Sequence, residues 1–142
     1  MQNNLLIILA IFFIIICITS GMIINIKGEK QEILNQNKEY EKYINKNIYG
    51  TDLATLIGKA INENNKNNIP KDENGYYIEN EQNSIKIYLN MKTVENTYTM
   101  EEIYKGEIIN FVKNFNIIQF RCTNITYHKK TGKIAKLIFQ EL

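Results

Sequence analysis

The sequence is poor in the residues from which catalytic and metal sites are usually built. Tryptophan is absent, His128 is the only histidine and Arg121 is the only arginine. The glycines are isolated from one another, so the chain has no Gly-rich phosphate-binding loop. No acidic cluster has the spacing of a calcium-binding loop. We therefore expect no enzyme activity, no bound cofactor and no metal site.

The two cysteines do not suit a disulfide. Cys17 lies inside a long apolar run, whereas Cys122 lies far along the more polar remainder. A disulfide requires two Cα atoms within about 7 Å, which a membrane-buried sulfur and a domain sulfur do not reach. The sequence therefore has no disulfide framework and gives no indication of the redox compartment.

The charge of the chain is close to balanced. Its 17 Lys and Arg residues against 15 Asp and Glu residues give a formal net charge of +2 at pH 7. This balance does not predict a nucleic-acid partner. Ile, Asn and Lys dominate the composition, and their A/T-rich codons are typical of a low-GC bacterial genome. A single Lys or Asn is therefore a weak indicator of function.

The strongest feature that is present is an apolar run near the N-terminus. It extends from Leu5 to Ile26 without a charged residue. A helix of this length spans roughly 33 Å, against a hydrocarbon core of about 30 Å. We therefore expect residues 1–26 to form a single transmembrane anchor in contact with membrane lipid. A cleaved signal peptide ending near Ser20 and Gly21 is the alternative, although its apolar core is usually shorter.

An amphipathic helical stem is predicted over residues 27–48. Apolar side chains recur there at spacings of three, four and seven, which is typical of one helix face. They are Ile33, Tyr40, Tyr43, Ile44 and Ile48. We expect protein partners to bind through the anchor helix and this stem.

Residues 49–142 predict one small α+β domain with two helical regions. Leu53 to Ile61 has the apolar periodicity of a helix, and Thr51 or Asp52 is placed to cap it. A capping-box pattern of Thr99 and Glu102 starts a second helical region, which Gly106 breaks.

The same domain is expected to hold a roughly four-stranded antiparallel sheet. Residues 76–78, 84–92, 117–127 and 133–140 are the predicted strands, with the clearest alternation in the second. Residues 80–83 form the loop of the first expected hairpin. Residues 128–132 form the second, where Gly132 supplies the positive φ such a loop often needs.

Cys122, His128 and Arg121 are residue types that cysteine transpeptidases use. Cys122 and His128 are six residues apart in one predicted stretch, which places them roughly 20 Å apart when extended. A nucleophile and its base must lie within hydrogen-bond reach of each other. We therefore expect Cys122 to be a small core residue and His128 to be a loop residue.

Two polar loops could be taken for a calcium site and a nucleic-acid interface, but a simple turn accounts for each. The run from Asp72 to Gly75 is typical of a polar turn rather than of a calcium site. Lysines gather around the second expected hairpin loop at positions 129, 130, 133 and 136. We expect this basic tip to be a solvated turn and not a nucleic-acid interface.

The order of anchor, stem and small sheet resembles that of type IV pilins and Tad-type minor pilins of low-GC bacteria. The segment from Tyr49 to Ile57 is also similar to a segment in short membrane proteins of clostridia. Classical pilins carry a basic leader and a glutamate five residues into the apolar run. No such leader precedes the run here, and Leu9 stands at the glutamate position. The resemblance is to minor pilin-like proteins, and it implies a non-enzymatic component of a pilus or secretion apparatus.

We expect the protein to reside in the cell membrane with its domain outside the cytoplasm, as the resemblance implies. Five lysines follow the anchor at positions 27, 30, 38, 42 and 46, and the positive-inside rule takes them as favouring a cytoplasmic domain. The alternative function is a cytoplasm-facing accessory domain that binds a partner or a ligand. The side of the membrane on which the domain lies discriminates the two.

Overall fold

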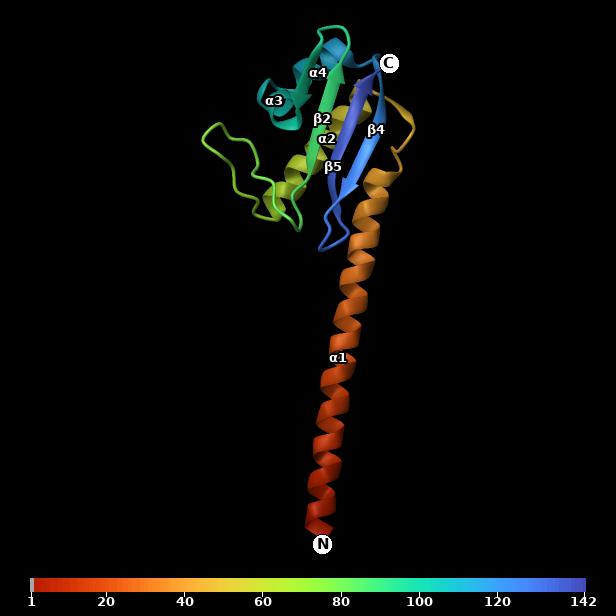
Figure 1. The fold of residues 1–142 in the computed structure, drawn as a ribbon, viewed down its shortest axis with the longest axis vertical. Coiled ribbons are helices and arrows are strands. Elements are labelled where there is room, and N and C mark those ends of the chain that lie inside the picture. Colours follow the sequence, from red (N-terminus) through yellow and green to blue (C-terminus); the bar gives the residue numbers. More distant parts are fainter. Residues whose placement is uncertain (1) are drawn as a thin grey trace. The chain divides into compact units, whose positions relative to one another are not determined.

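The computed structural model describes residues 2–142, with side chains described from Ile7 onward. The chain divides into two compact units, one ending at Asn35 and one running from Gln36 to Leu142. The elements are, in order (Figure 1), α1 (Gln2–Glu41), β1 (Asn47–Tyr49), α2 (Gly50–Lys66), β2 (Lys86–Met91), β3 (Asn96–Thr99), α3 (Met100–Lys105), α4 (Ile108–Phe115), β4 (Gln119–Tyr127) and β5 (Ile134–Glu141). The expected α+β class with a long apolar N-terminal helix is confirmed.

The first unit consists of the N-terminal part of α1. Within the described residues, α1 is the one helix long and apolar enough to cross a membrane. Its large apolar side chains between Ile7 and Ile26 are 45 to 71% exposed. Thr19 Oγ1 donates to the Ile15 carbonyl and Ser20 Oγ to the Ile16 carbonyl, so these hydroxyl groups are satisfied within the helix. The helix is compatible with a single-pass membrane or signal-anchor segment.

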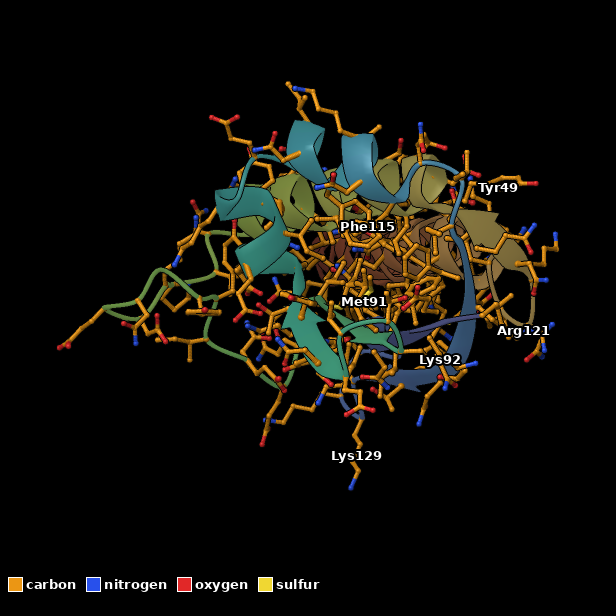
Figure 2. All side chains as sticks on the ribbon, turned by 90° about the horizontal axis from the view of Figure 1, so that it is seen from above. Tyr49, Met91, Lys92, Phe115, Arg121 and Lys129 are labelled. Atoms are coloured by element: carbon orange, nitrogen blue, oxygen red, sulfur yellow. The ribbon has the colours of Figure 1, made fainter. Side chains whose placement is uncertain are left out.

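The second unit has two layers. Five strands form one sheet in the order β1-β4-β5-β2-β3, and α2, α3 and α4 lie on one of its faces (Figure 1, Figure 2). The core fills the space between these layers. Leu53 and Ile57 of α2 meet Leu89, Phe120 and Phe139 of the strands there, and all five side chains are fully buried. The apolar helix face expected over residues 53–61 is confirmed.

The sheet is mixed, so the expected four-stranded antiparallel sheet is wrong in detail. β5 pairs antiparallel with β4 through the expected hairpin, but it pairs parallel with β2 on its other side. β2 forms an antiparallel hairpin with β3, and β1 pairs with β4 at the other edge. The parallel pair arises because α3 and α4 carry the chain from the β2–β3 hairpin across to β4. β5 then returns beside β2 in the same direction.

Residues 76–78, an expected strand, are not part of the sheet. Their backbone groups do not bond to a neighbouring strand of the sheet: Ile78 N donates to the Pro70 carbonyl, the Tyr76 carbonyl accepts from Asp72 N, and Tyr77 N donates to Glu101 Oε1. Tyr77 forms only an isolated bridge with Lys71. The hairpin partner of β2 is therefore β3, which follows it after a short turn.

The expected stem ends earlier than residue 48. α1 ends at Glu41, Asn45 has a positive φ of 57°, and Ile48 lies in β1. Asparagine tolerates this left-handed conformation better than most residues, which allows the chain to leave the helix there. The spacing of Ile44 and Ile48 fits a helix face, but Ile44 instead bridges to Cys122 and Ile48 pairs with Phe120.

The N-terminus of α2 is set by close packing rather than by a side-chain cap. Tyr49 occupies the N-cap without a side-chain hydrogen bond, so the expected cap by Thr51 or Asp52 is wrong. A Cβ added to Gly50 would collide with the backbone carbonyl of Phe115. Glycine therefore allows the end of α4 to approach the start of α2.

The second helical region follows the sequence prediction closely. Thr99 Oγ1 accepts from Glu102 N and the Glu102 carboxylate accepts from Thr99 N, which confirms the capping box. The region breaks at Gly106 into α3 and α4, as expected. The β4–β5 loop contains Gly132 with a positive φ of 71°, which is also as expected.

Candidate functional site

A groove lies between the β2–β3 hairpin and the helices α3 and α4. It has a volume of about 310 Å³. The hairpin contributes Met91, Val94 and Tyr98 to its lining, and α3 contributes Ile103. Figure 2 shows Met91, at the end of β2, between the strands and the helix layer.

The helix wall of the groove follows from the spacing of residues on α4. Glu107, Phe111 and Phe115 recur every four residues and therefore share one face with Asn110 and Asn114. Phe111 is buried, and its ring lies 5.1 Å from that of Phe115. The wall is thus aromatic at its base and polar toward its mouth.

Two glutamates are among the described lining residues of the groove, and none of these residues is Lys or Arg. Glu102 is held by the capping box, and it also accepts a hydrogen bond from the Tyr76 hydroxyl at 3.4 Å. Glu107 is exposed and forms no ion pair with any other described residue. Counting both glutamates as ionised, the lining has a formal charge of about −2 at neutral pH.

Glu107 also has an unusual backbone. It is the N-cap of α4, with φ 62° and ψ 111° and no side-chain cap bond. A non-glycine residue with positive φ costs about 1–3 kcal/mol and persists where the surrounding structure imposes it. The short connection between α3 and α4 imposes it here.

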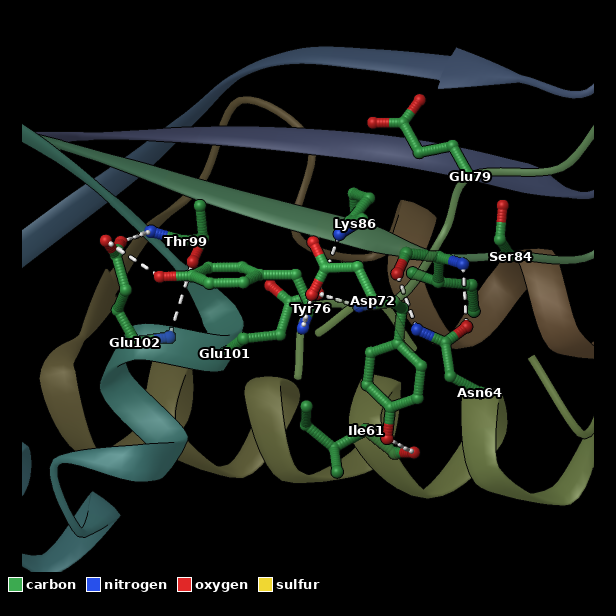
Figure 3. Close-up of polar contacts among 12 residues, drawn as sticks. Ile61, Asn64, Asp72, Tyr76, Glu79, Ser84, Lys86, Thr99, Glu101 and Glu102 are labelled. Carbon is green, nitrogen blue, oxygen red and sulfur yellow. Dashed lines mark hydrogen bonds and ion pairs between the residues drawn. The ribbon is translucent and has the colours of Figure 1, made fainter. Parts of the chain in front are cut away.

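A second polar cluster lies outside the groove, where β3 ends and α3 begins. Lys86 Nζ lies 2.7 Å from Glu101 Oε1, and both side chains are buried. Glu101 Oε1 also accepts from Tyr77 N at 3.1 Å, whereas Glu101 Oε2 has no hydrogen-bond partner among the described residues. Figure 3 shows this cluster between β2, α3 and the loop before β2. Lys86 alternates with the apolar residues of its strand, a position that favours the solvent side, but its side chain is buried.

The long loop between α2 and β2 is held by the same cluster and by α2. The Tyr77 hydroxyl donates to Asn65 Oδ1 at 2.6 Å. Asn64 is fully buried and pairs with both backbone groups of Ile85, because its amide donates to the carbonyl and its Oδ1 accepts from the N–H, each at 2.8 Å. These contacts give the cluster a structural role, because they fix the loop and the start of β2.

The structure does not bring Cys122, His128 and Arg121 into a shared site. Cys122 is buried in β4, and burial raises the pKa of its thiol, which disfavours the reactive thiolate. His128 is also buried, with Nε2 2.7 Å from the Ser84 carbonyl oxygen. Arg121 is exposed and donates to Asn47 Oδ1 at 2.9 Å. The core role expected for Cys122 is confirmed, whereas His128 is a buried contact at the start of its loop.

Charged side chains of the two polar loops form contacts within the domain. Asp72 Oδ1 accepts from Asn74 N and Tyr76 N, at 2.9 and 2.8 Å, so this carboxylate holds its own turn. At the lysine-bearing β4–β5 end, Lys130 forms an ion pair with Glu81 and Lys136 forms one with Glu79. Acidic partners therefore offset part of the basic charge of that tip. Among residues 2–142, no group of three or more His, Cys, Asp or Glu side chains is placed to hold a metal ion.

Neither a family model, a curated protein nor a solved structure matches this chain. Its function is therefore inferred from its own residues and geometry.

The groove was not among the sites suggested by the sequence. Its hairpin wall depends on β3, an edge strand without apolar alternation, so no sequence pattern indicated it. The helix wall does leave a trace, because a glutamate and two asparagines alternate with phenylalanines at helical spacing over residues 107–115. A face that mixes amide, carboxylate and aromatic groups differs from an ordinary core face.

Proposed function

We propose that this protein is a non-enzymatic, single-pass membrane-anchored protein that assembles with protein partners through its N-terminal helix. A pilin-like minor component of a pilus or secretion apparatus, with its domain outside the cytoplasm, is the form we favour. The carrying observation is the uncovered apolar surface of α1 between Ile7 and Ile26. In water such a surface is strongly unfavourable, whereas lipid or a partner helix covers it. The separation of Cys122 from His128 supports the non-enzymatic role.

The side of the membrane on which the domain lies tests this proposal. Lys129 is exposed at the β4–β5 loop, and Lys129→Cys in a Cys122→Ser chain offers one accessible thiol outside the apolar helix. Labelling of intact cells by an impermeant thiol reagent is expected. The parent Cys122→Ser chain, which retains only Cys17, is the matched control. Labelling that requires cell lysis would overturn the extracytoplasmic role.

Assembly through the helix has a separate test. Cys17 is exposed on the apolar part of α1, so its sulfur reports the approach of a neighbouring helix. Mild oxidation of native membranes is expected to trap a Cys17-linked dimer or adduct, which Cys17→Ala abolishes. Recovery of the monomer alone at every oxidant concentration would contradict assembly through this face.

A second function is favoured by one observation, the five lysines that follow the apolar run. It is a cytoplasm-facing accessory domain that binds a partner or a ligand. Failure of the intact-cell labelling, with full labelling after lysis, is the result this alternative requires.

A further inference from the structure

We propose that the groove between the β2–β3 hairpin and α3–α4 binds a small organic ammonium ion with an aromatic or branched apolar body. This site goes beyond the proposed function, because it depends neither on the orientation of the domain nor on assembly of the N-terminal helix.

The size and lining of the groove suit a small molecule. Its volume of about 310 Å³ lies at the lower end of ligand sites in proteins. Met91, Ile103 and Phe111 form a buried apolar floor, each no more than 8% exposed. Such a floor recognises an apolar body rather than a fully polar solute.

The charge of the lining selects a cation. Glu102 and Glu107 are the charged groups among the described lining residues. The nearby Lys105 forms no ion pair with either glutamate among the described residues. Its ammonium group instead bonds the Asn74 carbonyl and lies 4.5 Å from the centre of the Tyr76 ring. An anion would therefore meet two like charges beside a low-dielectric wall, whereas an ammonium ion would be attracted.

The remaining lining groups complement an ammonium ion in two ways. Tyr98, Phe111 and Phe115 are aromatic lining residues, and the face of an aromatic ring attracts a cation through its quadrupole. Asn110 Nδ2 donates to the Gly106 carbonyl at 3.2 Å, which leaves Oδ1 of that amide as an acceptor for an ammonium N–H. Carboxylate, amide oxygen and aromatic ring are the groups that bind an organic amine, and residues that carry all three line this one groove.

Three probes of similar size and different charge test the proposal on the full chain in phosphatidylcholine nanodiscs. They are 2-phenylethylammonium, neutral 2-phenylethanol and anionic 3-phenylpropionate, with empty nanodiscs as the background. Ligand-observed NMR titration is expected to show saturable binding of the ammonium probe, at least about tenfold tighter than the neutral probe and with no binding of the anion. Equal affinities for the ammonium and neutral probes, or no ammonium binding, would overturn the proposal.

Two pairs of variants locate the site. Glu107→Gln is expected to weaken ammonium binding about tenfold, whereas Glu73→Gln, an exposed carboxylate outside the lining, leaves it unchanged. Val94→Lys is expected to abolish binding, whereas Ile109→Lys does not, because both side chains are exposed but only Val94 lines the groove. Binding that survives both Glu107→Gln and Val94→Lys would place the probe elsewhere and refute the assignment. These outcomes leave the thiol-labelling result unaffected.

Discussion

At the residue scale, the ion pair of Lys86 and Glu101 is the contact whose loss we expect to be most destabilising in the domain. Both side chains are at most 7% exposed, so neither charge is solvated when its partner is removed. Lys86→Met alone is expected to lower the free energy of unfolding by about 3–5 kcal/mol, because it leaves the Glu101 carboxylate buried and unpaired. Urea unfolding followed by circular dichroism measures the loss.

The double variant Lys86→Met/Glu101→Leu separates the two origins of that loss. Replacing both members of a buried pair by apolar residues is often neutral or stabilising. We therefore expect the double variant to recover most of the stability, apart from about 1–3 kcal/mol for Tyr77 N, which loses its acceptor. A double variant less stable than Lys86→Met would contradict this account, because it would show that the unpaired Glu101 carboxylate does not destabilise the domain.

The positive φ of Glu107 is expected to lower the stability of the domain. Glycine adopts φ near 62° without the steric penalty that a side chain has there. Glu107→Gly is expected to raise the free energy of unfolding by about 1 kcal/mol, since relief of about 1–3 kcal/mol of strain exceeds the greater entropy loss of glycine. Glu107→Gln retains the strain and serves as the control. An unchanged or lower stability of the glycine variant would show that the backbone is not strained.

At the scale of elements, Glu141 connects the end of β5 to the β2–β3 turn. Its carboxylate accepts hydrogen bonds from the Thr93 hydroxyl, from Thr93 N at 2.9 Å and from Lys92 N at 2.7 Å. The Thr93 hydroxyl, followed by these amides, lowers the pKa of the carboxyl below its usual value. A lowered pKa in the folded state means that this stabilisation is present above the unfolded pKa and is lost as the pH falls through the folded pKa.

The expected result follows from that sign. The contribution of Glu141 to the free energy of unfolding is constant above about pH 5. It decreases as the pH falls through the ordinary glutamate range near 4 and below. Glu141→Gln is expected to lower stability at pH 7 by about 2 kcal/mol and to flatten the acid limb. Urea unfolding at pH 3 to 7 measures both effects. Glu73→Gln is the control, and a wild-type-like acid limb in Glu141→Gln would contradict this assignment.

The elements that the sequence predicted are those with a strong period or a specific local motif. α2 has a full apolar face, and the Thr99 capping box fixes the start of α3. β3 could not be predicted in the same way, because an edge strand of four residues has no fully buried side chain to create an alternation. The strand predicted over residues 76–78 is wrong for a related reason. Tyr77 is buried because it fixes a loop, not because it belongs to the buried face of a strand.

Local sequence patterns could not predict the candidate groove for a further reason. Its two walls come from segments that the sequence assigned separately, and Glu107 has no motif that marks it. The burial of Lys86 is similar, because alternation along β2 places it on the solvent side. β3 ends at Thr99, which pairs with Tyr88, so no strand lies beside Lys86 on that side of β2. α3 and Tyr77 cover Lys86 there instead. Contacts of this kind depend on the topology of the sheet, which the hydrophobic period does not specify.

At the scale of the whole molecule, the last turns of α1 belong to the second unit. Asn37 is buried and clamps the β4–β5 loop, because its Nδ2 donates to the Gly132 carbonyl at 2.8 Å and its Oδ1 accepts from Ile134 N at 3.0 Å. Tyr40 is 4% exposed, and its burial raises the pKa of its phenol. The Tyr127 hydroxyl donates to Glu41 at 2.9 Å. The foldable soluble unit therefore requires residues before the end of α1.

Three soluble fragments test where that unit begins. Residues 27–142 and 36–142 are expected to unfold cooperatively at nearly the same urea concentration, because the residues removed between them have no buried side chain. Residues 42–142 are expected to lose about 3 kcal/mol, from the burial of Tyr40 and the two hydrogen bonds of Asn37. Asn37→Ala within residues 27–142 isolates the clamp, and a loss of about 2 kcal/mol is expected. If the fragment 42–142 matched the others, the unit would begin after α1, and the clamp would be incidental. A loss confined to 42–142 and Asn37→Ala would instead place the boundary inside the helix, before Asn37.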